Sequence, residues 1–191
     1  MYKTAKVRIK GVCPILFHNC RMVNPLDEFK KEQSKYTSKS KKTDDDHAEI
    51  SRLDWYAAIY TDADGRVIVP AEMLEAAIIG GAKKSKLGTQ FKAAVLVPDP
   101  SRLEYDGPKK IDALWKDGRF TDMRVVGIQR NKVIRTRPIF QSWAVEFDLM
   151  FEPTLADEDT IKKAIEDAGM QCGIGDYRPR YGRFELVSFV V

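Results

Sequence analysis

The strongest constraint on the fold is a stretch in the last third of the chain, residues 143–152, in which apolar and polar side chains alternate. One parity carries Trp143, Val145, Phe147, Leu149 and Phe151, and the other carries polar residues such as Glu146, Asp148 and Glu152. A period of two residues is the pattern of a β-strand with one buried face. This strand is therefore predicted to be central to the core.

The residues after this strand predict a helix, a loop and a final strand. Four apolar residues recur at helical spacing behind a cap near Asp157, and Gly169 ends the helix. They are Ile161, Ala164, Ile165 and Ala168. Residues 184–191 then predict the last strand.

The N-terminal part of the chain also predicts strands and a helix. Val7 and Ile9 alternate with three basic residues, which predicts a half-buried strand with a basic open face, and the apolar run 15–17 follows as a first strand or its bulged continuation. Thr43 and Asp46 resemble a capping box, and apolar spacing predicts a helix over 44–60.

The middle of the chain predicts shorter elements. A strand at 66–69 leads into a helix that ends near Gly80–Gly81 or runs on through Ala82. Short strands are expected at 93–97 and 103–105, at most one helical turn within 111–120, and a strand at 123–128. Residues 24–42 are rich in Lys, Ser, Gln and Glu and predict a mobile insertion within a single domain over 1–191.

The segment 173–184 combines three glycines with arginines and tyrosines in a way that no core requires. Glycines allow positive φ and close backbone approach, guanidinium groups match phosphates, and tyrosine rings stack on bases. The residues predicted to contact nucleic acid here are Tyr177, Arg178, Arg180, Tyr181 and Arg183. The alternative is a glycine-rich connection whose arginines are merely solvated.

Two further basic elements extend this prediction. Lys83, Lys84 and Lys86 surround a helix terminus and form a second candidate phosphate site, or else an exposed charged turn. Arg130, Lys132, Arg135 and Arg137 form the third element. Because the first two and the last two have opposite strand parity, we interpret residues 123–142 as a basic β finger that reaches along a nucleic-acid backbone, rather than as a plain solvated hairpin.

Catalytic and metal-binding readings of the sequence are weaker. His18 has no nearby partner, so His18 and Asn19 are predicted to contact nucleic acid or to pack rather than to catalyse. The acidic residues 44–46 beside His47 suit the first turn of a helix. Three cysteines without Cys-x-x-Cys spacing are interpreted as reduced thiols, and we expect no metal and no cofactor.

Charge and hydropathy limit the class of protein. The net charge of +4 is mild, so the placement of the cations matters more than their sum. No apolar run approaches the roughly 20 residues of a membrane span, and the N-terminus carries no secretory signal pattern. We expect a cytoplasmic protein with no membrane partner.

Three segments together resemble the RAMP superfamily, whose ferredoxin-like or RRM-like members include subunits of CRISPR effector complexes. They are the first strand leading into 11–16, the segment 67–77 with Ala71 and Glu75 in place of the family's usual residues, and Gly182–Phe184 at the end of the glycine-rich loop. The whole chain also resembles a family of bacteriophage and prophage proteins that carries no known activity. The RAMP resemblance implies an α+β fold, with an antiparallel sheet, helices on one face and a protruding β finger. It also implies RNA or single-stranded DNA held by the sheet face, the loop and the finger.

The leading hypothesis is a non-catalytic protein of phage origin that binds single-stranded DNA or RNA, with copies assembling along the strand in replication, recombination or defence. In it, the three basic segments converge on one groove. One alternative is a nuclease that uses His18, His47 or the acidic residues 44–46. The other is a phage protein that grips an acidic host protein or a nucleotide.

Overall fold

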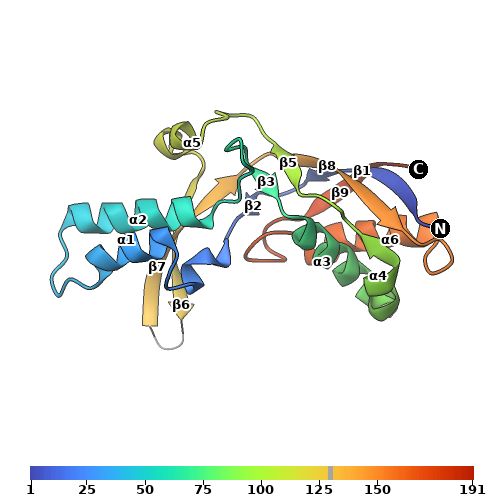
Figure 1. Cartoon of the computed structure of the whole chain (residues 1–191), viewed down its shortest axis with the longest axis horizontal. Helices are drawn as coiled ribbons and strands as arrows, with labels where there is room; N and C mark the ends of the chain where they lie inside the picture. The colour runs from blue at the N-terminus through green and yellow to red at the C-terminus, as the bar shows by residue number, and fades with distance from the viewer. Residues whose placement is uncertain (129–130) are drawn as a thin grey trace. The chain divides into compact units, whose positions relative to one another are not determined.

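The computed structural model describes residues 1–128 and 131–191, and the chain divides into two compact units (Figure 1). The first unit comprises Met1–Ile15, Thr61–Gly107 and Phe140–Val191. The second unit comprises Leu16–Tyr60 and Pro108–Ile139. The expectation of a single domain over 1–191 stays a prediction.

The first unit is built on an antiparallel sheet with the strand order β3-β5-β8-β1-β9, to which β4 adds by pairing with β8. Its strands are β1 (Lys3–Gly11), β3 (Ile68–Val69), β4 (Val95–Leu96), β5 (Ser101–Glu104), β8 (Ala144–Phe151) and β9 (Phe184–Val190). The predicted central position of the alternating strand is confirmed, because β8 pairs with β1 over its full length and with β5 on its other side.

Two helical crossovers complete the fold of the first unit. α3 (Ala71–Ala82) lies between β1 and β5 in sequence, and α6 (Glu158–Asp167) lies between β8 and β9. Together with the order β5-β8-β1-β9, these crossovers give the ferredoxin-like arrangement and confirm the predicted α+β class. A short helix α4 (Gly88–Ala94) and the single-turn helices η2 (Lys83–Ser85) and η3 (Ala168–Cys172) extend this layer.

Alternation in the strands decides which sheet face is buried. Ala5, Val7 and Ile9 of β1 are at most 1% exposed, as are Val145 and Leu149 of β8. On the opposite parity, Lys6, Lys10, Glu146 and Asp148 are exposed and charged, and Arg8 is half-buried. The apolar stripes of α3 and α6 are buried as well, so this face and these helices make the core.

Gly81 lies where α3 and α6 pack most closely against each other. A Cβ on Gly81 would lie 1.9 Å from the carbonyl oxygen of Ala164 in α6, so only glycine lets the two helices approach this closely. The helix runs on through Ala82, which is one of the two endings that the sequence left open.

The second unit pairs two helices with a β-hairpin. α1 (Glu28–Thr37) packs against α2 (Asp44–Ala58), and β6 (Thr121–Ile128) pairs with β7 (Asn131–Phe140), beside which β2 (Ile15–Leu16) lies. The buried Trp55 of α2 donates a hydrogen bond from Nε1 to the Phe120 carbonyl (2.9 Å). The helix predicted over 44–60, its Thr43–Asp46 capping box and the hairpin are all confirmed.

Three predictions of local structure are corrected. Residues 24–42 contain α1, whose polar sequence has good helix formers but no apolar stripe to announce a helix; whether the segment is mobile stays a prediction. Ile111–Asp117 forms α5, which is longer than the single turn expected. Ala93 and Ala94 belong to α4, so the predicted strand 93–97 shortens to β4, because the buried Phe91 and Ala94 are in helical register.

Candidate nucleic-acid interface

The loop between η3 and β9, residues 173–183, has a neck closed by backbone hydrogen bonds. The Ile174 nitrogen donates to the Gly182 carbonyl (2.9 Å), and the Gly182 nitrogen donates to the Pro14 carbonyl (2.8 Å). Gly182 has φ +73°, and a Cβ there would lie 1.7 Å from the Ile174 oxygen. Glycine at 182 is therefore a steric requirement of this loop, which we call the Gly/Arg/Tyr loop.

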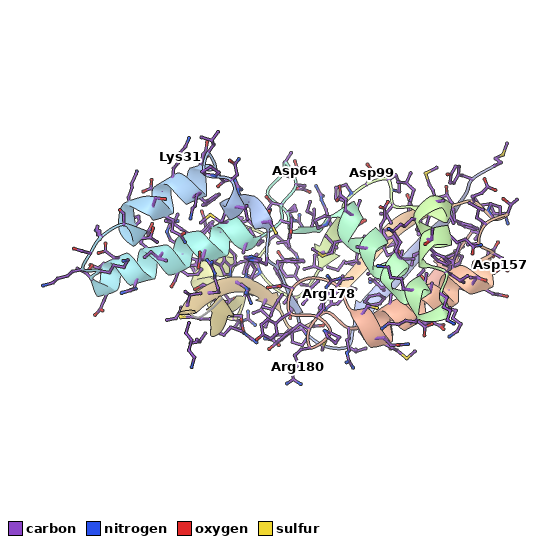
Figure 2. All side chains as sticks on the ribbon, turned by 90° about the horizontal axis from the view of Figure 1, so that it is seen from below. Lys31, Asp64, Asp99, Asp157, Arg178 and Arg180 are labelled. Carbon is purple, nitrogen blue, oxygen red and sulfur yellow. The ribbon has the colours of Figure 1, made fainter. Side chains whose placement is uncertain are left out.

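The tip of the Gly/Arg/Tyr loop presents its side chains to solvent. Tyr177 is 48% exposed, and its ring meets that of Tyr181 edge-on with centroids 6.2 Å apart. Arg178 and Arg180 are both exposed, and Figure 2 shows the Arg180 side chain projecting away from the ribbon. Arg183 instead folds back and donates from Nε to the Pro179 carbonyl (2.8 Å).

The charge of this loop is not cancelled locally. Within residues 1–128 and 131–191, no carboxylate forms an ion pair with Arg178, Arg180 or Arg183. Two exposed guanidinium groups beside an exposed aromatic ring are the components that single-stranded nucleic-acid sites combine. The arrangement can therefore bind phosphates and stack a base.

The lysine cluster of the first unit is also exposed. Lys83 and Lys84 lie in η2, and Lys86 follows with a left-handed backbone, φ +62°. The Lys83 side chain passes over Gly88, where a Cβ would lie 2.4 Å from Lys83 Cγ. In the part of the chain that the structure describes, none of the three lysines has an ion pair.

Whether the lysine cluster and the Gly/Arg/Tyr loop share one groove stays a prediction. Ser85 and Leu87 line a hollow with Asp159 and Thr160, which belong to the first turn of α6. The Gly/Arg/Tyr loop begins after η3, at the other end of the α6–η3 segment. Ser85 and Leu87 of the lysine segment thus adjoin the first turn of α6, whereas Cys172, the last residue before the loop, lies against Gly80 of α3.

The hairpin of the second unit is less basic on its surface than predicted. Lys132 is exposed, but Arg135 pairs with Asp54 (Nη1 to Oδ1, 3.4 Å) and Arg137 is only 7% exposed. The predicted site residue Arg130 lies outside the described residues. The directly opposed pair Val125 and Ile134 is about 60% exposed, so apolar side chains take part of the face that was expected to be basic.

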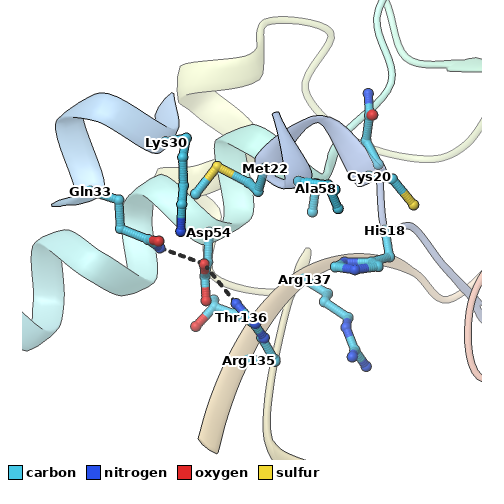
Figure 3. A pocket seen from close by; sticks show the side chains of 12 residues that line it. His18, Cys20, Met22, Lys30, Gln33, Asp54, Ala58, Arg135, Thr136 and Arg137 are labelled. Atoms are coloured by element: carbon cyan, nitrogen blue, oxygen red, sulfur yellow. Dashed lines mark hydrogen bonds and ion pairs between the residues drawn. The ribbon is translucent and has the colours of Figure 1, made fainter. Parts of the chain in front are cut away.

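A pocket in the second unit collects four predicted site residues. Its walls come from η1 (Cys20–Val23) and the residues before it, from α1 and α2, and from β7, and its volume is about 130 Å³ (Figure 3). The predicted residues that line it are His18, Asn19, Arg135 and Arg137. Asn19 caps η1, with its side chain accepting a hydrogen bond from the Arg21 nitrogen. We call this the Asp54 pocket.

The centre of the Asp54 pocket is a carboxylate that is 8% exposed. Asp54 Oδ1 accepts from Gln33 Nε2 (2.6 Å) and pairs with Arg135, and Figure 3 shows these two side chains approaching it from different sides. Lys30, from α1, and Thr136, from β7, also line the pocket. A buried charge needs such partners, so the hydrogen bond from Gln33 also helps hold α1 against α2.

Sequence reasoning missed Lys30, Gln33, Asp54 and Thr136. Asp54 carried a usable signal, because it follows Leu53 on the buried side of α2, where an unpaired acid would be costly. Lys30 and Gln33 carried none, because α1 has no apolar periodicity.

Of the acidic residues 44–46 that were considered for catalysis, Asp46 has a structural role. Asp46 accepts from the Thr43 nitrogen (3.0 Å) and from Lys39 Nζ (2.6 Å). The Lys39 ammonium group holds the pKa of Asp46 below its ordinary value. In residues 1–128 and 131–191 no three His, Cys, Asp or Glu side chains are grouped as metal ligands.

The open sheet face, predicted to be basic, has two of its three cations, Lys6 and Arg8, paired with acids. Lys6 pairs with Asp148 across the β1–β8 register (3.0 Å), and Arg8 forms two hydrogen bonds to Glu104 (2.5 and 2.7 Å). The Arg8 guanidinium lowers the pKa of Glu104 by hydrogen bonding to it. Lys6 and Arg8 are therefore already partnered by the protein's own acids, whereas the exposed Lys10 has no ion pair within the described residues.

Comparison with known proteins supports the fold and nothing finer. No family model and no curated protein matches the chain. Among solved structures, a chain from the cryo-EM structure of the Type III-B Cmr-beta bound to cognate target RNA matches with a TM-score of 0.51 and 12% identity. The match covers 98% of this chain and 60% of that chain, so this protein spans less than two thirds of its structural neighbour. At this identity the likeness concerns the fold alone.

No helix among the described residues is long and apolar enough to cross a membrane.

Proposed function

We propose that this chain is a non-catalytic protein that binds single-stranded DNA or RNA. It would act in a phage's replication, recombination or defence, with copies assembling along the strand. The observation that carries the proposal is the tip of the Gly/Arg/Tyr loop, where exposed Arg178 and Arg180 stand beside the exposed ring of Tyr177 on a neck closed by backbone hydrogen bonds.

In this proposal each side chain at the tip would make one kind of contact with the strand. The two guanidinium groups would each neutralise a phosphate, which releases counterions and makes binding depend on salt. The Tyr177 ring would stack on a base, which needs no sequence preference because every base has a π-face. Since the neck is closed, little ordering of the loop is left to oppose binding.

Other features support the proposal to different degrees. The unpaired lysines 83, 84 and 86 would give a second contact to the phosphate backbone, separate from the loop. The sheet face would contribute little, since Lys6 and Arg8 are already paired. The structural neighbour is a chain from a structure of Cmr-beta bound to cognate target RNA, which adds support by analogy of fold alone.

The test is fluorescence anisotropy with the full chain and labelled single-stranded DNA, single-stranded RNA and duplex of one sequence. We expect a preference for single strands and an affinity that falls steeply between about 50 and 200 mM salt. A flat salt response, or no binding at low salt, would remove the proposal. The ultraviolet absorbance ratio of the freshly purified protein reports co-purified nucleic acid before any titration.

Two rival functions predict different results. A nuclease would cleave the labelled strand, and cleavage would disappear in His18→Ala or Asp46→Ala; because Asp46 caps α2, its variant must first be shown to fold. A protein that grips an acidic host protein would retain its partner in a pull-down after nuclease treatment, whereas nucleic-acid bridging would vanish.

A further inference from the structure

More basic than acidic side chains line the Asp54 pocket. Lys30 and Arg135, besides the 7% exposed Arg137, line it against one carboxylate, Asp54. That carboxylate already accepts from Gln33 and pairs with Arg135. In the described part of the chain, Lys30 has no ion pair, and Figure 3 shows it extending from α1 into the pocket region. The net charge of the lining favours an anion.

The hydrogen-bonding groups of the pocket point to the same kind of ligand. Thr136 is 1% exposed, lines the pocket, and its Oγ1 has no hydrogen-bond partner. A buried hydroxyl without a partner is costly, so a bound acceptor would stabilise it. Arg135 has five N–H donors, and Asp54 engages a single nitrogen of the guanidinium group.

The size of the pocket limits the ligand to a small group. Pockets for whole ligands of drug size occupy about 300–1,000 Å³. At about 130 Å³, this pocket is too small for a whole nucleotide but has room for one tetrahedral oxyanion. A strand that continued in both directions would need an open channel, so the group must sit at the end of a molecule.

We propose that the Asp54 pocket binds one phosphomonoester group. The Lys30 ammonium and Arg135 guanidinium neutralise its charge, the Thr136 hydroxyl donates to one of its oxygens, and Asp54 positions Arg135. The group can come from inorganic phosphate, from a free mononucleotide or from the phosphorylated end of a nucleic-acid strand. The last source rests on the proposed function; the first two do not.

The first experiment measures binding of inorganic phosphate and of a mononucleotide to the full chain by isothermal titration calorimetry at constant ionic strength. Lys30→Gln is expected to weaken binding roughly tenfold or more and Thr136→Val about fivefold, because a charged and a neutral hydrogen bond are lost. The matched controls are Lys31→Gln, the exposed neighbour on α1 (Figure 2), and Thr121→Val, a second threonine of the hairpin with a buried unpartnered hydroxyl that does not line the pocket. Both controls are expected to bind like the native chain.

The second experiment compares oligonucleotides that differ only in a phosphate at the 5′ or the 3′ end. The phosphorylated strand is expected to bind roughly tenfold more tightly. Lys30→Gln should remove this preference and leave the affinity for the unphosphorylated strand unchanged. Circular dichroism and thermal unfolding confirm that each variant folds, and if Thr136→Val does not fold, Lys30→Gln alone decides.

The outcomes separate the two proposals. If no strand binds but phosphate or mononucleotide binding depends on Lys30, the proposed function fails and the pocket stands. If strands bind without end preference while the mononucleotide binds through Lys30, the source is a free phosphomonoester. If no probe binds in a way that depends on Lys30, or if Lys31→Gln weakens binding equally, the pocket proposal is overturned.

Discussion

Cys13 Sγ lies 3.2 Å from the backbone nitrogen of Arg183, which donates a hydrogen bond to the sulfur. A second hydrogen bond links the adjacent residues, because the Gly182 nitrogen donates to the Pro14 carbonyl oxygen. The base of the Gly/Arg/Tyr loop is thus bound to the segment that follows β1. The position of the loop therefore depends on glycine at 182 as well as on the residues at its tip.

Gly182→Ala is expected to lower the free energy of unfolding by at least about 2 kcal/mol, because alanine must adopt a positive φ and its Cβ meets the Ile174 carbonyl. Urea unfolding measures the change. Gly127→Ala is the control, since a Cβ there has no neighbour within 4 Å. Equal unfolding midpoints for the two variants would contradict the steric role of Gly182.

The double variant Arg178→Gln, Arg180→Gln should weaken binding to single strands and make it less sensitive to salt. If each arginine neutralises one phosphate, the slope of log affinity against log salt falls by about 1.4 in magnitude. Anisotropy titrations at several salt concentrations give the slope. An unchanged slope would show that the loop does not touch the backbone.

Tyr177→Ala should cost about 1–3 kcal/mol of binding free energy if its ring stacks on a base, whereas Tyr177→Phe keeps the ring and should bind like the native chain. The affinity for single-stranded oligonucleotides at one salt concentration measures both. Equal losses in the two variants would point to the hydroxyl group and would exclude stacking as the role of this residue.

The double variant Lys6→Gln, Arg8→Gln removes as much charge as the loop variant but should leave strand affinity unchanged, because Asp148 and Glu104 already neutralise these cations. The same anisotropy assay measures it. A loss as large as that of the arginine variant would place the strand on the sheet face, as the RAMP resemblance first implied.

Asp46 predicts a pH dependence of stability. Its pKa is lowered from 3.8 by the hydrogen bond from Lys39, so the ionised side chain stabilises the folded state. This contribution is complete above pH 3.8 and is lost as pH falls below 3.8 through the folded pKa. The difference in urea midpoint between the native chain and Asp46→Asn should therefore narrow at acid pH. A constant difference from neutral to acid pH would contradict this role.

The sequence was informative where a local pattern decides the structure. Thr43 and Asp46 satisfy backbone groups within one turn of α2, so the spacing of three residues sufficed to predict the cap. The alternation around Phe147 likewise predicted β8 as the central strand, because in a strand every second side chain points to the same face and the apolar ones mark the buried face.

The sequence was uninformative where a residue depends on a distant partner. α1 has no apolar stripe, and its Gln33 is buried because of Asp54, 21 residues away. Arg137 and Lys132 share one basic run, yet the first is 7% exposed and the second lies at the surface. Composition counts both as cations and cannot tell them apart.

The amino-acid sequence by itself determined the α+β class, the central strand, the capped helix and the glycine-rich loop, because these follow from periodicity and backbone chemistry over a few residues. Only the tertiary structure decided which cations face solvent. The lysines of η2 lie beside a hollow at the first turn of α6 and the arginines of the loop follow η3, while Lys6 and Arg8 are paired with acids on other strands of the sheet. Charges interact through space, so whether a cation is free to bind a ligand depends on neighbours that only the folded chain brings close.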